Sequence, residues 1–243
     1  MSENEARAKS RYCGKRFSIL GDSISTLAGY NPSGYSVFFA GEVCARANVF
    51  NARDTWWGQV ISRLGGELLV NNSWSGSRVT KLRGQTTLFP SGCSDERTGG
   101  LHRGGTMPDV IIVYLGTNDW AQGIEAKCLD CADWQHRAWS TVFDSAYERM
   151  LMKLRRNYPA AEIFCCTLCP TLISANPSFT FPESYGGVHI ERYCETIRHI
   201  AEINGCRVID LYKYRTPYNS IDGSHPNSAG MNTLASLIIK EMI

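Results

Sequence analysis

The sequence predicts an α/β fold in which a central parallel sheet is covered by helices on both faces. Apolar runs typical of buried strands alternate with helical patterns along the whole chain. The strongest run, residues 108–115, is almost continuously apolar, which is typical of a strand buried on both faces. Several runs end in polar or glycine-containing turns, as expected where parallel strands reach one edge of a sheet.

The first half of the chain begins with a short apolar strand over 17–20 that ends at Gly21, in a turn opening into a helix. Residues 27–51 show no clean periodicity, and we expect a long excursion over the surface. A helix then runs from Asp54 and Thr55 to Arg63 and ends at Gly65, because glycine is favoured just after a helix. A strand over 67–72, a largely irregular stretch with one short helix over 81–106 and the strand at 108–115 follow.

The second half continues the alternation. A helical pattern covers 138–157, a strand 162–168, a helix 191–204 and a last strand 206–211. The loop 170–187 contains prolines and aromatic residues and is a candidate lid or wall over a pocket. Pro226 is expected in the first turn of a final helix.

Composition narrows the class of protein. With 243 residues and 43% hydrophobic content, one large domain over 15–243 is favoured, preceded by a flexible tail over 1–14. Interspersed charges with a net charge of +2 give no footprint for nucleic acid, and no apolar run approaches the ~20 residues of a membrane helix. The polar N-terminus lacks the apolar core of a signal peptide, so we expect a cytoplasmic protein. The oligomeric state is not indicated.

Two groups of cysteines could hold a metal or act in redox chemistry. Cys128 and Cys131 have the C-x-x-C spacing, and Cys165, Cys166 and Cys169 end an apolar run. A zinc site needs four ligands, and these groups lack the regular spacing of two paired knuckles. We therefore expect small buried fillers in a strand and a loop.

Candidate catalytic residues lie near both ends of the chain. Ser23 follows the first strand, where a rigid turn suits a nucleophile, although Asp22 or Ser23 can instead cap the next helical turn. Asp222 and His225 lie three residues apart in the loop before the last helix. An imidazole there can take a proton from a serine hydroxyl while the carboxylate orients it, and capping of the last helix is the alternative.

Two further loops offer hydrogen-bond donors. Gly76 lies in a turn after the strand 67–72, and Asn118 follows the strand 108–115. A glycine amide or an asparagine side chain can donate to an oxyanion, and a plain turn is the alternative for each. Because loops after parallel strands gather along one edge of a sheet, all these residues can lie together.

The ordered blocks Gly21-Asp-Ser23, Ser75-Gly76-Ser77, Gly116-Thr-Asn-Asp119 and Asp222-Gly-Ser-His-Pro226 resemble those of the SGNH hydrolases, also called GDSL-type esterases and lipases. Ile24 stands where the name-giving pattern has leucine. The resemblance implies a three-layer α/β/α flavodoxin-like fold and a serine acylhydrolase with no metal or other cofactor. It implies that Ser23 is the nucleophile, that His225 is the general base and that Asp222 orients it. Ser23, Gly76 and Asn118 then supply the oxyanion hole.

The substrate expected from the sequence is a small polar or short-chain carboxylic ester, such as an O-acetylated carbohydrate. Aromatic residues near the motifs can stack on a sugar or can belong to the core, and they are Tyr30, Tyr35, Trp74, Trp120 and Tyr185. Phe38 and Phe39 can line a pocket near Ser23 or pack the surrounding loop down. An acyltransferase or thioesterase with the same triad, and a non-catalytic carbohydrate- or partner-binding homologue, are the other functions considered.

Overall fold

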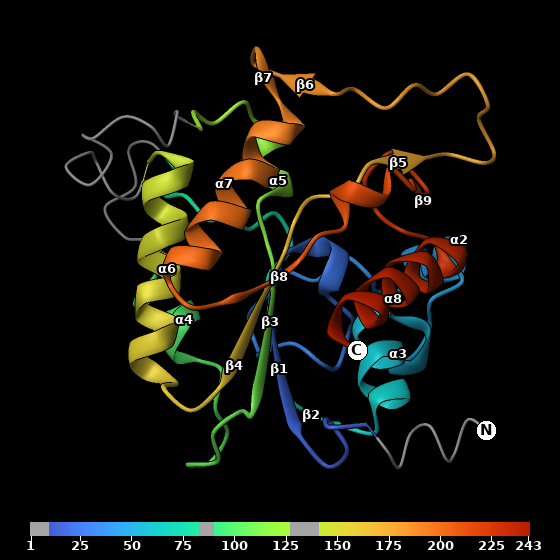
Figure 1. The fold of residues 1–243 in the computed structure, drawn as a ribbon. Helices are drawn as coiled ribbons and strands as arrows, with labels where there is room; N and C mark the ends of the chain where they lie inside the picture. The colour runs from blue at the N-terminus through green and yellow to red at the C-terminus, as the bar shows by residue number, and fades with distance from the viewer. Residues whose placement is uncertain (1–9, 83–89, 127–140) are drawn as a thin grey trace.

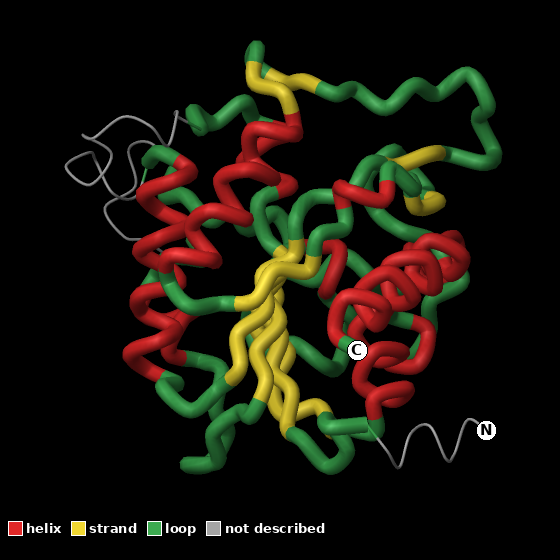
Figure 2. The backbone as a smooth tube through the Cα atoms, viewed as in Figure 1, coloured by secondary structure: helices red, strands yellow, loops and turns green. Residues whose placement is uncertain are grey.

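The computed structural model describes residues 10–82, 90–126 and 141–243, and shows a five-stranded parallel sheet between two layers of helices (Figures 1 and 2). The strand order is β2-β1-β3-β4-β8, the order of flavodoxin-like sheets. The predicted α/β/α fold is therefore confirmed. The strands of this sheet are β1 (Arg16–Gly21), β2 (Glu67–Ser73), β3 (Val110–Tyr114), β4 (Glu162–Cys166) and β8 (Arg207–Ile209).

The sheet is buried on both faces because its apolar side chains alternate between two cores. In β3, Val110, Ile112 and Tyr114 pack on the side of α3 (Trp56–Leu64) and α8 (Ser228–Met242). Ile111 and Val113 pack on the other side, against α6 (Phe143–Asn157) and α7 (Ile190–Ile203). Figure 1 shows α3 and α8 on one face of the sheet and α6 and α7 on the other.

Most predicted helices and strands are present, with changes at several ends. The helix α3 begins after its cap, Thr55, and ends at Gly65, which has the left-handed φ of 75°. The segment 27–51 is not wholly irregular, because it contains α2 (Glu42–Ala47), and the turn after β1 opens only into a 3₁₀ helix, Ser23–Ser25. The helix α6 begins at Phe143, and the first predicted residues of that helix, 138–140, lie outside the described part of the chain.

Short elements complete the chain. The predicted short helix within 81–106 is α4 (Asp95–Gly99), and 3₁₀ turns cover Ala52–Asp54 and Tyr212–Tyr214. The loop 170–187 is partly ordered into strands: β5 (Thr171–Leu172) pairs with β9 (Tyr218–Asn219), and β6 (Ser184–Tyr185) pairs with β7 (Val188–His189). The start of the loop is therefore paired with a distant segment, β9, and its end forms a local hairpin that leads into α7.

Packing begins before the predicted domain boundary at residue 15. Tyr12 is buried, and its ring contacts those of Phe17 and Phe164. The division of the chain into one domain and a tail stays a prediction.

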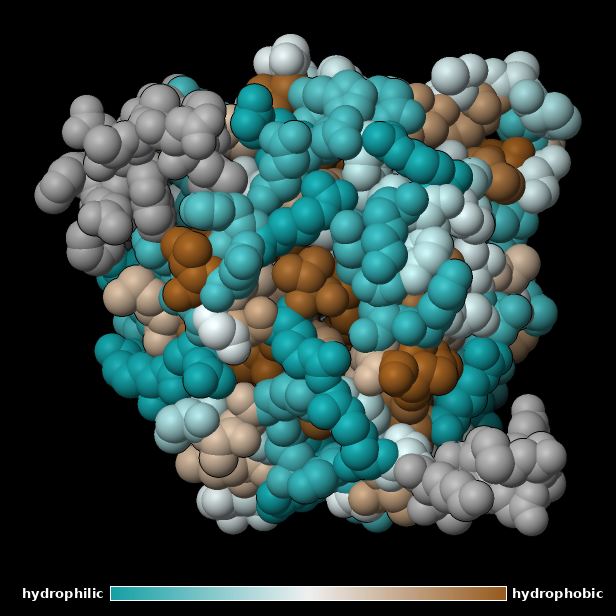
Figure 3. All heavy atoms as spheres, viewed as in Figure 1, coloured by the Kyte–Doolittle hydropathy of each residue, from teal (hydrophilic) through white to brown (hydrophobic). Residues whose placement is uncertain are grey.

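Apolar surface is dispersed on one face of the molecule. On the face in Figure 3, hydrophobic side chains form separate patches among hydrophilic ones. No helix in the described residues is both long and apolar enough to cross a bilayer.

Candidate active site

The first three strands of the sheet end at the same level. Gly21 at the end of β1 is paired with Ser73 of β2 on one side and with Tyr114 of β3 on the other. The turns that carry Ser23, Gly76 and Asn118 follow these strand ends. The parallel arrangement therefore brings the three predicted loops to one edge of the sheet, as expected.

Ser23 begins the 3₁₀ turn after β1 and is almost completely buried. Its neighbour Asp22 caps this turn, because Asp22 Oδ1 accepts from the Ile24 amide at 3.0 Å. Full burial raises the pKa of Asp22 to about 7, against the smaller lowering effects of the Ile24 amide and of His225. The capping alternative thus applies to Asp22, while the Ser23 hydroxyl is left for another partner.

That partner is His225, which lies 202 positions further along the chain. His225 Nε2 is 2.9 Å from Ser23 Oγ, and His225 Nδ1 is 2.8 Å from Asp222 Oδ2. Partial burial raises the pKa of Asp222, but hydrogen bonds from the side chain and amide of His225 outweigh it and lower this pKa to about 2. Asp222 is therefore ionised at neutral pH, which favours the tautomer with Nδ1–H toward Asp222 and Nε2 free to accept from Ser23.

The loop that carries Asp222 and His225 is held from several sides. Thr171 Oγ1 in β5 donates to the Gly223 carbonyl at 2.7 Å, and the Gly223 amide donates to Ser220 Oγ at 3.0 Å. Ser220 Oγ in turn donates to the Leu172 carbonyl at 2.8 Å. The first residues of the loop 170–187, predicted as a lid or wall, thus hold the loop that carries His225 in place.

The helix after this loop has a different cap from either residue considered. Asn227 caps α8, because its Oδ1 accepts from the Gly230 amide at 3.0 Å. The expected place of Pro226 in the first helical turn is wrong, since Pro226 precedes the cap and bridges to Ser220. Asp222 and His225 do not cap α8.

An aromatic ring covers one face of the imidazole. The rings of Phe38 and His225 are stacked, with centroids 3.4 Å apart and planes 10° apart. Phe38 is fixed through its backbone, because its amide donates to Thr26 Oγ1 at 2.9 Å. The sequence left the role of Phe38 open, and the structure places it where it restricts rotation of His225.

The Gly76 and Asn118 turns are joined to each other. Asn118 Nδ2 donates to the Ser77 carbonyl at 2.9 Å, which uses one of its two hydrogens. Asn118 lies in the first turn of α5 (Thr117–Ala121), so the expected loop after β3 is a short helix. Gly76 has a φ of 77°, in the region that favours glycine. Among the described residues, no protein acceptor is recorded for the amides of Ser23 or Gly76.

Two buried ionisable residues to which the sequence assigned no role support these turns. Asp119, next to Asn118, accepts from the amides of Val79 and Thr80 at 2.8 and 3.0 Å, and burial raises its pKa. Arg97 of α4 is fully buried and donates to groups in both the Ser23 and Gly76 turns. Asp119 belongs to a recognisable block, whereas Arg97 lies in a polar stretch that gives no signal of burial.

A cavity of about 140 Å³ lies beside the Asp222 loop. Trp120 and Tyr185 line it. Both belong to one aromatic cluster, because the ring centroids of Tyr185 and Phe181 lie 4.7 and 5.1 Å from that of Trp120. The loop 170–187 supplies part of the wall, including Phe179, Phe181 and Pro182.

The other aromatic residues singled out in the sequence lie elsewhere. The ring centroids of Tyr35 and Trp74 are 4.2 Å apart. The Ser75 amide, next to Trp74, donates to the Ser36 carbonyl at 2.8 Å. This pair therefore flanks the Gly76 turn. Tyr30 packs its ring against Trp57 and is 41% exposed, so the structure does not bring it into the cavity.

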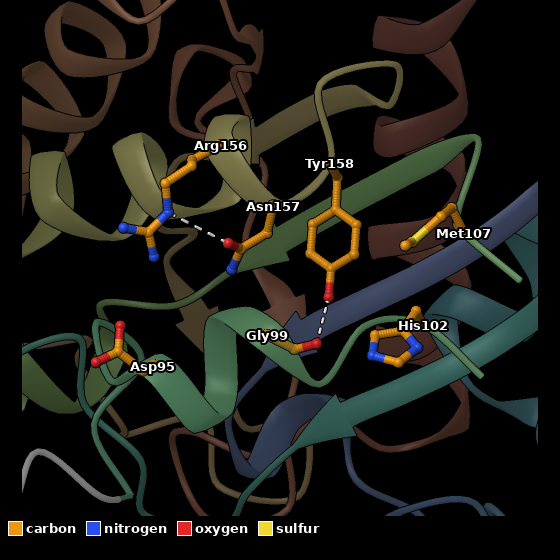
Figure 4. A pocket seen from close by; sticks show the side chains of 7 residues that line it. All are labelled: Asp95, Gly99, His102, Met107, Arg156, Asn157 and Tyr158. Carbon is orange, nitrogen blue, oxygen red and sulfur yellow. Dashed lines mark hydrogen bonds between the residues drawn. The ribbon is translucent and has the colours of Figure 1, made fainter. Parts of the chain in front are cut away.

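A second hollow lies near the amino ends of β3 and β4, away from the site (Figure 4). It has a volume of about 440 Å³ and includes His102, Asn157 and Tyr158 among its lining residues. The Tyr158 hydroxyl is used structurally, because it donates to the Gly99 carbonyl and accepts from the Leu101 amide. No serine, threonine or cysteine is among the residues that line this hollow.

The cysteines of the apolar run are packing residues. Cys165, Cys166 and Cys169 are buried, and burial raises the pKa of the Cys166 and Cys169 thiols. Cys128 and Cys131 lie outside the described residues. Over 10–82, 90–126 and 141–243, no group of three or more His, Cys, Asp or Glu residues could hold a metal ion.

Comparison with known proteins identifies relatives of the chain. Residues 15–174, more than half of the chain, match the model of the GDSL-like lipase/acylhydrolase family. The curated cellulase/esterase CelE of Acetivibrio thermocellus is 37% identical over 60 residues, which are 25% of this chain and only 6% of that protein.

Several solved structures resemble most of the chain. A candidate GDSL-like lipase from Bacteroides ovatus is 24% identical, with a TM-score of 0.70 over 94% of this chain and 98% of the other. The corresponding protein from Bacteroides uniformis is 26% identical, with a TM-score of 0.68 over 93% and 94%. A family two carbohydrate esterase from Clostridium thermocellum, solved with cellohexaose, shares the fold at 19% identity and a TM-score of 0.56 over 96% and 64%.

Proposed function

Because the chain belongs to the GDSL-like lipase/acylhydrolase family, we propose that it hydrolyses a small polar or short-chain carboxylic ester through an acyl-enzyme on Ser23. The observation that carries the proposal is the continuous hydrogen-bonded chain from Ser23 Oγ through His225 to Asp222, with distances of 2.9 and 2.8 Å. Nucleophile, base and orienting carboxylate are all within the reach that this chemistry needs.

In the first step, Ser23 Oγ attacks the ester carbonyl carbon while His225 Nε2 takes the hydroxyl proton. The imidazolium that forms is stabilised by the Asp222 carboxylate, which is already ionised and already accepts from Nδ1. Phe38 limits ring rotation, so Nε2 stays directed at the hydroxyl.

The negative charge that develops on the carbonyl oxygen needs donors placed beforehand. The amides of Ser23 and Gly76 and the second hydrogen of Asn118 Nδ2 are the proposed donors, since none of them has a recorded acceptor among the described residues. Collapse of the tetrahedral intermediate expels the alcohol, which takes its proton from His225. Water activated by His225 then hydrolyses the acyl-enzyme and restores Ser23.

The substrate is proposed from the surroundings of this chain of residues. A cavity of about 140 Å³ is well below the roughly 300–1,000 Å³ of pockets for drug-sized ligands, which favours a short acyl group or a small ring. Trp120 and Tyr185 are among the residues that line it, while Tyr35 and Trp74 flank the Gly76 turn. An O-acetylated carbohydrate combines a short acyl group with a polar ring that stacks on aromatic faces.

The proposal is tested with a fluorophosphonate probe, which phosphonylates activated serines. Wild type is expected to gain the mass of one adduct, and Ser23→Ala none. Ser174→Ala, which removes an exposed serine of the loop 170–187, is the matched control and is expected to react like wild type. An unlabelled, folded wild type would refute the proposal and favour a non-catalytic binding protein. Product analysis with 4-nitrophenyl acetate, with and without a competing alcohol, separates hydrolysis from acyl transfer.

A further inference from the structure

Arg97 is a fully buried arginine whose hydrogen bonds join the two turns that carry the proposed oxyanion donors. Its Nη2 donates to the Gly21 carbonyl at 2.8 Å, and Gly21 immediately precedes the Asp22-Ser23 turn. Its Nη1 donates to Ser77 Oγ at 2.7 Å, and Ser77 immediately follows Gly76. The planar guanidinium therefore spans the gap between the β1 and β2 turns with fixed geometry.

Two more bonds fix the guanidinium on the sheet edge. Nη2 also donates to the Asn72 carbonyl in β2 at 3.0 Å, and Nη1 to the Pro90 carbonyl at 2.7 Å. Asn118, the third proposed donor, also binds Ser77, because its Nδ2 donates to the Ser77 carbonyl at 2.9 Å. Ser77 is thus contacted by Arg97 through its side chain and by Asn118 through its backbone.

Arg97 forms no salt bridge with a carboxylate in the described part of the chain. All four of its hydrogen-bond acceptors are carbonyls or a hydroxyl. The carboxyls of Asp22 and Glu96 interact with it electrostatically, but among the described residues neither forms a salt bridge with it. A buried charge is costly unless it is well hydrogen-bonded or balanced by an opposite charge. An oxyanion held by the Ser23 and Gly76 amides would supply that opposite charge during the reaction.

Lys153 is a second buried cation, and unlike Arg97 it forms a salt bridge within the described residues. It is also buried and also lies against α4, but its Nζ pairs with the carboxylate of Asp95 at 2.8 Å and donates to the Cys93 carbonyl at 2.7 Å. Lys153 contacts neither catalytic turn. Its substitution removes a buried charge of the same sign from the same region.

We propose that Arg97 is a positioning residue that fixes the Ser23 and Gly76 turns relative to each other, through a buried cation that makes no salt bridge with another described residue and that binds residues close to both proposed oxyanion donors. The inference rests on the proposed function for its catalytic part, whereas the fixing of the two turns can be measured without any substrate. Arg97 touches neither substrate nor reacting atoms in this scheme, and acts through the donors that do.

The test compares Arg97→Met, Arg97→Lys and Lys153→Met with wild type. Hydrogen exchange read by mass spectrometry follows residues 21–25 and 73–77. Fluorophosphonate labelling gives the reactivity of Ser23 and the number of competent sites, and kcat and KM for 4-nitrophenyl acetate are expressed per labelled site. Normalising in this way removes any loss that comes only from a smaller folded fraction.

We expect faster exchange in both segments of Arg97→Met, with labelling rate and kcat lowered roughly 10²-fold and KM changed little, as for loss of an oxyanion donor. Arg97→Lys keeps the charge but cannot contact all four acceptors, so we expect an intermediate loss of roughly tenfold. Lys153→Met is expected to match wild type in both readouts. If Arg97→Met does not fold, the Arg97→Lys variant decides alone.

Unchanged exchange in both segments, or kcat per labelled site within about threefold of wild type in the Arg97 variants, would overturn the inference. An unlabelled wild type would instead refute the proposed function, and the exchange comparison would still show whether Arg97 holds the two turns. The two failures are therefore distinguishable.

Discussion

Replacing Asn118 by alanine removes a side chain that makes one structural hydrogen bond and is proposed to make a second one to the oxyanion. One hydrogen of Nδ2 is donated to the Ser77 carbonyl at 2.9 Å, and the other is the proposed donor to the oxyanion. The first bond exists in the resting enzyme, whereas the second forms only as charge develops on the substrate. The variant should therefore change stability and catalysis by different amounts.

The magnitudes follow from these two bonds. Loss of one amide-to-carbonyl hydrogen bond at a partly buried site lowers the free energy of unfolding by about 1 kcal/mol. Loss of one oxyanion donor raises the activation free energy by about 3 kcal/mol, which lowers kcat roughly 10²-fold. Because the donor acts on the transition state, KM should change little.

The assay measures kcat and KM with 4-nitrophenyl acetate and unfolding in urea, for Asn118→Ala and for a control. Asn157→Ala is a matched control, since Asn157 Nδ2 also donates to one backbone carbonyl, that of Thr98 at 3.2 Å, far from Ser23. The control should lose similar stability and keep wild-type kcat. A fall in kcat of less than about fivefold in Asn118→Ala, at normal stability, would refute its role as an oxyanion donor.

Three further predictions concern the neighbours of Ser23. Asp222→Asn should lower kcat roughly 10³- to 10⁴-fold because the amide favours the wrong tautomer of His225, and steady-state kinetics would contradict the triad if the loss stayed below tenfold. The pKa of Asp22 is raised from 3.8 to about 7, so its contribution to the free energy of unfolding is complete below pH 3.8 and is lost as the pH rises through 7. Asp22→Asn should therefore flatten this part of the pH profile of stability, measured by urea unfolding. An unchanged profile would argue against a buried, titrating Asp22. Phe38→Leu should lower kcat several-fold by freeing the His225 ring, with KM unchanged, and equal kinetics in both proteins would show that the stacking has no catalytic effect.

The periodic parts of the sequence predicted the fold well because burial dominates there. The run 108–115 is central in the sheet, and the apolar face of α3 is buried as expected. The helix α2 was missed, since Glu42–Ala47 is too short to show an amphipathic stripe. Pro226 was misplaced because proline is also suited to the residues just before a helix cap, where the structure has it.

The candidate site was predictable where a residue type signals its chemistry. Ser23, Asp222 and His225 were singled out because their chemistry is recognisable in a loop after a strand, and the structure joins them by hydrogen bonds. Arg97 gave no such signal, because an arginine in a polar stretch is usually solvated. Its burial depends on carbonyls at Gly21 and Asn72, which only the tertiary structure brings within reach. The same holds for Phe38, whose contact with His225 is made across the chain.

The hydrogen bond between Ser23 and His225 joins positions 202 residues apart. During synthesis, Ser23 therefore emerges long before His225, and under the proposed function its hydroxyl is not activated until the loop before α8 has docked on β5. A partly folded or truncated chain would then carry Ser23 without the proposed reactivity. If Ser23 takes up a serine-directed label as proposed, the uptake measures the chains folded from the first strand through to the histidine loop, and labelling can serve as a folding assay.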